Sequence, residues 1–335
     1  MTRTDIPLAA RARALAPGLM LAVTVAMAAQ FLSGHYGVPV MLMAILLGMP
    51  LHFLAEDDRA GPGIDFAART LLRAGVALLG LRVSLDMVRD IGWGFVLVMV
   101  GCVAAVILLS VLLARLMGRD RAFGFLTGGS VAICGASAAM AIGSILPQRQ
   151  NSERDLAFTV ISVTAFSTVA MILYPIVAGA LGLDDHQTGL FLGGTIHDVA
   201  QVVGAGYSVN EETGDIATIV KLIRVTLLAP TVLIGALVLR RHHPATGKRP
   251  PLMPGFVVAF LLLATLNSAH LVPQAVIDPA STLSRSLLVT AVAAVGMKTS
   301  LGRLVDVGGA AFAMLTLQTL TLAVLVLVPL LLGVV

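Results

Sequence analysis

Long apolar runs, separated by short polar segments, set the pattern of this chain. The runs cover residues 17–33, 38–54, 67–83, 93–116, 124–146, 156–181, 188–208, 216–239, 254–269, 283–298 and 308–334. Most of them approach the length of about 20 residues that an α-helix needs to cross a bilayer. They lack the strict alternation of apolar and polar residues that is typical of membrane β-strands. The pattern therefore predicts an all-α, polytopic integral membrane helix bundle of about 10–11 transmembrane helices.

Composition supports the same interpretation. Hydrophobic residues make up 58% of the 335 residues and charged residues 12%, which is more apolar than a soluble globular domain tolerates. Because the polar segments are too short to fold alone, we expect a single transmembrane domain over residues 1–335. Within it, residues 1–16 are predicted to form an N-terminal tail and residues 240–253 a basic loop.

Arginine and lysine gather in the N-terminal tail, in the segment 115–121 and in the loop 240–253. Short basic segments of membrane proteins stay on the cytoplasmic side. With eleven crossings these three segments fall on one side, so we predict a cytoplasmic N-terminus. The basic residues do not form a solvated stripe with interleaved aromatic residues, so nucleic acid binding is not expected.

One sequence pattern occurs twice and suggests an internal repeat. The stretch Gly80–Leu85 is echoed by Gly296–Leu301, and both are followed by an aspartate and a glycine at matching distances. The two copies are separated by an odd number of predicted crossings. This arrangement predicts an inverted repeat of the kind found in secondary transporters, although chance similarity between apolar sequences is the alternative.

A second echo places glycine pairs in the middle of two apolar runs. Gly128 and Gly129 precede Ser130, as Gly193 and Gly194 precede Thr195. A glycine pair loosens a helix, and a following hydroxyl residue can cap a new one. We therefore predict two broken helices whose freed N-termini hold an anion. The alternative is that the glycines only allow close helix packing.

The two echoes occur in opposite order in the two halves of the chain. A single simple duplication therefore does not explain both of them.

Polar side chains within apolar runs are candidates for function because they are costly in lipid. His197 and Asp198, with Gln201 one turn later, are interpreted as a site for a coupling proton or cation. A structural hydrogen-bond network is the alternative. Arg82 and Lys298 occupy matching positions in the first echo, and either neutralise an anion or extend towards the membrane surface.

Four further basic residues are interpreted as anchors. Lys221 and Arg224 lie near the predicted start of a span, beside acidic residues, and Arg69 and Arg73 lie near the start of another. Basic side chains at such positions commonly fix a helix at the membrane surface.

The motifs of common enzyme classes are absent from the sequence. There is no HExxH, GxSxG or GxxxxGK[ST] motif, and Cys102 and Cys134 have no partners at the spacing of a metal site. We expect no catalytic residues, no metal and no cofactor, so the protein is not predicted to be an enzyme.

Two strings of residues carry a family resemblance. They run from Gly128 to Ala138 and from Gly193 to Val202, the second of which includes GTIHDVAQV. With these strings the chain resembles the YeiH-type family of bacterial inner-membrane proteins, which carry the label of sulfate exporters. More distantly it resembles the bile acid, arsenite and riboflavin transporter superfamily. The resemblance implies location in the bacterial inner membrane, inverted repeats and two broken helices that cross near the membrane centre.

The resulting expectation is a secondary active transporter that exports sulfate or a related small oxyanion or organic anion by alternating access, coupled to H⁺ or Na⁺. A passive anion channel is the alternative, and an intramembrane enzyme a weaker one. The expected partners are the lipid bilayer, the anion and the coupling ion. Whether the protein forms a homodimer is left open. The predicted substrate-binding residues are Gly128, Gly129, Ser130, Ser137, Gly193, Gly194, Thr195, Arg82 and Lys298.

Overall fold

The computed structural model describes residues 8–36, 40–81, 85–147, 152–240, 255–298 and 309–334, and every regular element within them is helical. The elements are α1 (Leu8–Tyr36), α2 (Val40–Gly48), η1 (Met49–Leu51), α3 (His52–Ala55), α4 (Gly61–Phe66), η2 (Ala67–Leu71), α5 (Leu72–Leu79), α6 (Leu85–Leu116), α7 (Arg121–Gly129), η3 (Ser130–Cys134), α8 (Gly135–Gly143), α9 (Ser152–Ala180), α10 (Asp185–Thr195), α11 (Val199–Val209), α12 (Glu211–Thr226), α13 (Leu228–Arg240), α14 (Gly255–Ser268), α15 (Gln274–Lys298) and α16 (Ala310–Leu331).

Each of the eleven apolar runs coincides with one helix or with consecutive helical pieces. Seven of the described helical segments are long and apolar enough to cross a membrane. Val40–Ala55, Val199–Val209 and Gly255–Ser268 are shorter apolar helices. The prediction of a polytopic membrane helix bundle is confirmed. The first helix begins at Leu8, however, so part of the predicted tail is helical.

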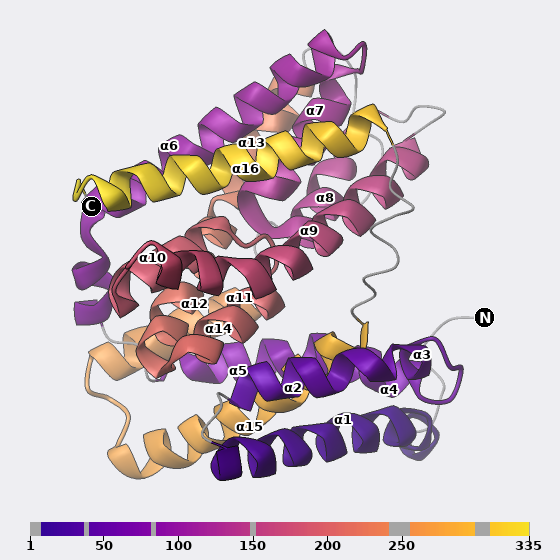
Figure 1. Ribbon diagram of the computed structural model, residues 1–335, viewed down its shortest axis with the longest axis vertical. Helices are drawn as coiled ribbons and strands as arrows, with labels where there is room; N and C mark the ends of the chain where they lie inside the picture. Colours follow the sequence, from indigo (N-terminus) through magenta and orange to yellow (C-terminus); the bar gives the residue numbers. More distant parts are fainter. Residues whose placement is uncertain are drawn as a thin grey trace.

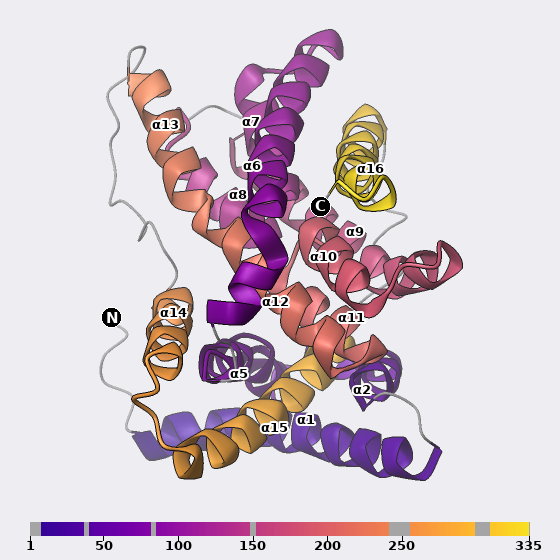
Figure 2. The ribbon, with the colours of Figure 1, turned by 90° about the vertical axis from the view of Figure 1, so that its left-hand side faces the viewer.

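The helices form two groups, which we call bundle A and bundle B (Figures 1 and 2). Bundle A contains α1–α5, α14 and α15, and within it α15 packs against both α2 and α5. Bundle B contains α6–α13 and α16, and within it α12 packs against both α10 and α11. Bundle A therefore joins the N-terminal helices to α14 and α15, and bundle B joins the middle of the chain to the C-terminal helix α16.

The glycines of the first echo allow close helix contacts in bundle A. A Cβ atom at Gly80 would lie 2.4 Å from the carbonyl oxygen of Phe260 in α14. A Cβ atom at Gly296 would lie 2.7 Å from the carbonyl oxygen of Ile45 in α2. Each copy of the motif thus brings its own helix, α5 or α15, against a helix from the other half of the chain.

The helices that carry the first echo make reciprocal contacts. The helix α15 packs against α2, and α14 packs against α5. In chain order the interrupted helix α7–α8 follows α5, whereas α10–α11 precedes α15. The inverted repeat stays a prediction.

Candidate functional site

The two interrupted helices meet inside bundle B. In the first, helix runs through α7 and η3 to Cys134 and resumes in α8 after a break at Gly135, whose φ is 45°. In the second, α10 ends at Thr195, and an extended segment leads to Asp198, the N-cap residue of α11. A Cβ atom at Gly135 would lie 3.6 Å from the carbonyl oxygen of His197, so the breaks are adjacent. Breaks in these two helices were predicted correctly, but the two halves fold back beside each other and do not continue across the bundle. A Cβ atom at Gly129 in α7 would lie 2.2 Å from Ile142 Cδ1 in α8, and Cβ atoms at Gly189 in α10 and Gly206 in α11 would both lie 3.2 Å from the Thr213 carbonyl oxygen.

The positions of the breaks were predicted wrongly. Gly128 and Gly129 lie within α7, and Gly193 and Gly194 lie within α10. A Cβ atom at Gly128 would lie 2.5 Å from the side chain of Ser110 in α6. These glycines serve close helix packing, which was the alternative interpretation.

The hydroxyl groups that follow the glycine pairs do not cap new helices. Ser130 Oγ donates to the carbonyl of Leu126, and Thr195 Oγ1 donates to the carbonyl of Phe191, each at 2.6 Å. Both bonds return to the preceding turn of the same helix. The expectation that Ser130 and Thr195 begin half-helices is therefore wrong, whereas Ser137 does lie in the first turn of α8.

The packing role of the second glycine pair can be tested by adding one methyl group. In Gly193→Ala the new Cβ would lie 2.4 Å from the carbonyl oxygen of Ala217 in α12. Because the contact is with backbone, we expect a loss of stability of about 1–3 kcal/mol, measured by unfolding in detergent. Gly101→Ala in α6 is the control, since nothing lies within 4 Å of its new Cβ. Equal effects of the two substitutions would contradict this role.

Lys221 of α12 lies at the contact between the two breaks. Its Nζ donates hydrogen bonds to the carbonyls of Ile133 at 2.7 Å, Ile196 at 3.0 Å and His197 at 2.5 Å. The side chain is completely buried. These oxygens are carbonyls freed where helices end, which otherwise have no partner in lipid.

Arg224, one turn further along α12, is also completely buried and binds the same region. Its guanidinium donates to the carbonyls of Val131, Ala132, Gly193 and Ile196 at 2.9–3.1 Å. Lys221 and Arg224 therefore join both broken helices to α12. The interpretation of these two residues as membrane-surface anchors is wrong.

The two cations also set the electrostatics of the crossing. They neutralise the carbonyl ends of α7–η3 and α10, where a helix dipole is negative. The opposite, positive ends are the first turns of α8 and α11. Both of these turns contribute residues to a cavity, through Ala136 and through Asp198 to Gln201.

The cavity has a volume of about 460 Å³ and lies between bundles A and B. Bundle A contributes three basic side chains to its lining, those of Arg69, Arg73 and Lys298. Bundle B contributes Asp198 and Gln201. Arg69 and Arg73 were interpreted as surface anchors, but they line this cavity.

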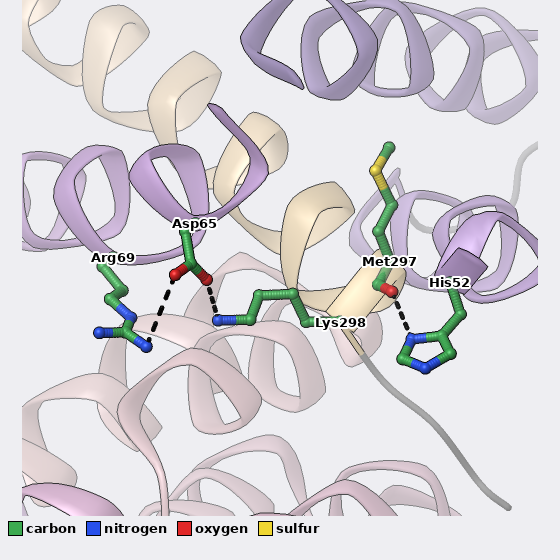
Figure 3. A network of polar contacts seen from close by, with 5 residues as sticks. All are labelled: His52, Asp65, Arg69, Met297 and Lys298. Carbon is green, nitrogen blue, oxygen red and sulfur yellow. Dashed lines mark hydrogen bonds and ion pairs between the residues drawn. The ribbon is translucent and has the colours of Figure 1, made fainter. Parts of the chain in front are cut away.

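Lys298 and Arg69 share a carboxylate from bundle A. The Lys298 ammonium forms an ion pair with Asp65, and Arg69 Nη2 lies 3.7 Å from the same carboxylate (Figure 3). Next to this group, His52 Nδ1 donates to the carbonyl of Met297 at 2.9 Å. The last turn of α15, which carries Lys298, is thereby tied to two other parts of bundle A.

The three predicted coupling residues lie in different surroundings. Asp198 and Gln201 line the cavity, and Gln201 Oε1 is buried without a hydrogen-bond partner among the described residues. His197 is completely buried, with Nε2 3.0 Å from Thr319 Oγ1, and it is not among the described residues that line the cavity. Arg82 lies outside the described residues, so its predicted role stays a prediction.

Sequence reasoning missed Lys221 and Arg224 as parts of the site. A signal was present, because two cations three residues apart share one face of a helix and lie in an apolar run. The apolar run begins at residue 216, whereas α12 begins at Glu211. The earlier start places both cations deeper in the span than a surface anchor lies.

Comparison with known proteins identifies the family of the chain. A model of the family described as "Conserved hypothetical protein 698" matches residues 17–315. UPF0324 membrane protein RB0971 of Rhizobium meliloti is 57% identical over 314 residues, which cover 93% of this chain and 91% of that protein. UPF0324 membrane protein TauZ of Paracoccus pantotrophus is 55% identical over 330 residues, covering 97% and 98%. No solved structure matches. The chain belongs to the UPF0324 membrane protein family, the YeiH-type family that its sequence motifs indicated.

Proposed function

We propose that the protein is a secondary active transporter that exports a small oxyanion, sulfate or a related sulfur oxyanion or organic anion, across the bacterial inner membrane. The observation that supports this most strongly is the charge of the cavity. Arg69, Arg73 and Lys298 line it together with the positive ends of α8 and α11, and Asp198 is the carboxylate among its described lining residues. Basic side chains and helix N-termini are the groups that hold desolvated anions.

The position of the cavity favours alternating access. Its walls come from η2, α5, α14 and α15 of bundle A and from α8, α9 and α11 of bundle B. Movement of one bundle against the other would therefore change access to the bound anion. A passive channel would instead need a path through the crossing, which Lys221 and Arg224 fill with buried, hydrogen-bonded side chains.

The predicted orientation suits export. With the loop 240–253 in the cytoplasm, α14 leads away from the cytoplasm and α15 returns to it, so Lys298 at the end of α15 lies near the cytoplasmic side. An exporter binds its substrate from that side.

Transport by the purified protein in liposomes tests the proposal. Sulfate, sulfite and small organic sulfonates are supplied in turn, and the pH and Na⁺ gradients are varied separately. We expect saturable movement of at least one of these anions. Arg73→Gln should weaken its apparent affinity by about ten- to hundredfold, because a charge-assisted contact contributes about 1.5–3 kcal/mol.

Arg285→Gln is the matched control, since Arg285 forms an exposed ion pair with Glu211 away from the cavity. Its transport should equal that of the natural protein. Failure to move any of the anions above the level of empty vesicles would overturn the proposal. Flux that never saturates and is indifferent to imposed gradients would support the passive channel instead.

A further inference from the structure

Three main-chain oxygens from two broken helices converge on one nitrogen atom. The carbonyls of Ile133, Ile196 and His197 lie 2.5–3.0 Å from Lys221 Nζ. Ile133 belongs to the end of the first interrupted helix, and the other two belong to the break of the second. We call these three oxygens and the space between them the carbonyl seat.

The carbonyl seat has the chemistry of a monovalent-cation site. Carbonyls freed at the ends of half-helices are the groups that coordinate the coupling Na⁺ in transporters with discontinuous helices. An ammonium group carries three N–H donors and no acceptor, which matches three carbonyl oxygens. The Lys221 ammonium thus stands where a free cation would bind.

The surroundings of the seat disfavour a second cation. Arg224 shares the Ile196 carbonyl with Lys221, at 3.0 Å from Nη1. Both side chains are completely buried, so little water screens their charges. A free Na⁺ entering here would meet two fixed positive charges and oxygens that are already bonded.

We propose that the Lys221 ammonium is a tethered substitute for a coupling cation in the carbonyl seat, so that anion transport by this protein does not require Na⁺. The inference rests on the proposed transport function. A tethered cation cannot leave on one side of the membrane and return on the other. The seat therefore holds the two broken helices together at every stage of the cycle, and the energy for transport comes from protons or from exchange of anions.

The first test measures whether Na⁺ matters to the natural protein. Anion transport in liposomes is compared with Na⁺, K⁺ or choline as the cation on both sides. We expect equal rates within a factor of two. A tenfold or greater increase with Na⁺ would overturn the inference while leaving the transport function intact, whereas no transport under any condition would count against the transport function itself.

The second test measures cation binding without transport. The thermal midpoint of the full chain in detergent is recorded with chloride salts of Na⁺, ammonium, methylammonium and choline at constant ionic strength. For the natural protein we expect no difference between the salts, and a specific rise with Na⁺ would overturn the inference even if no variant could be purified.

Lys221→Ala vacates the carbonyl seat, and Lys221→Met fills it with an apolar chain of similar length. We expect both variants to be less stable than the natural protein. Only the alanine variant should regain part of its thermal midpoint with Na⁺ or ammonium, in a saturable manner. A folded alanine variant whose midpoint is the same in all four salts would show that the seat does not bind cations.

Discussion

Replacement of Arg224 by methionine is expected to be among the most destabilising single substitutions in this protein. Methionine has a similar length but no donors, so the carbonyls of Val131, Ala132 and Gly193 would lose their bonds to the guanidinium. Each buried oxygen left without a partner costs about 1–3 kcal/mol. We expect a loss of at least about 3 kcal/mol in unfolding free energy, or no folded protein, together with loss of transport.

The measurement is denaturant or thermal unfolding in detergent, with size-exclusion chromatography to detect protein that does not fold. Arg285→Met is the matched control, because its partner Glu211 lies 2.6 Å away and both side chains are about half exposed. Exposed ion pairs contribute about 0–1 kcal/mol. If Arg224→Met were no more harmful than Arg285→Met, Arg224 would not hold the crossing together.

The transmembrane helices were predictable because few backbone conformations are stable in lipid. Backbone groups find no partners in hydrocarbon, so every apolar run of sufficient length becomes helix. The eleven runs therefore reappear as helices with shifted ends. This constraint is weaker at the ends of the helices, where water is near. In α1, for example, the helix begins before Pro17, where the apolar run begins.

The existence of the two breaks was predictable, but their positions were not. Glycine in a membrane helix either loosens the backbone or lets a neighbouring helix approach closely. The sequence alone does not distinguish these two roles. Gly128 and Gly193 face α6 and α12 closely, which only the tertiary structure reveals. Gly135, where the first break lies, is also one glycine among many, and its positive φ is set by the crossing.

The composition of the cavity was not predictable from local sequence either. Basic residues at 69, 73 and 298 are far apart in sequence, and they line one cavity because α15 packs against η2 and α5.

The second large effect is expected for Asp198→Asn, and it concerns energy coupling. Asp198 Oδ1 accepts the Val199 N–H at 3.0 Å at the start of α11, and the Asp198 N–H donates to Ser167 at 3.0 Å. Asparagine keeps an oxygen for this cap but can neither carry a charge nor release a proton. We expect transport driven by a pH gradient to fall at least tenfold while the unfolding midpoint changes little.

Because Asp198 faces a cavity with three basic side chains, removal of its negative charge should also tighten anion binding. Exchange of internal for external anion should therefore continue in Asp198→Asn, whereas Asp198→Ala, which lacks the cap as well, should lose stability too. The two variants separate the charge of the residue from its structural role. Unchanged transport under a pH gradient in Asp198→Asn would exclude this carboxylate as the proton carrier.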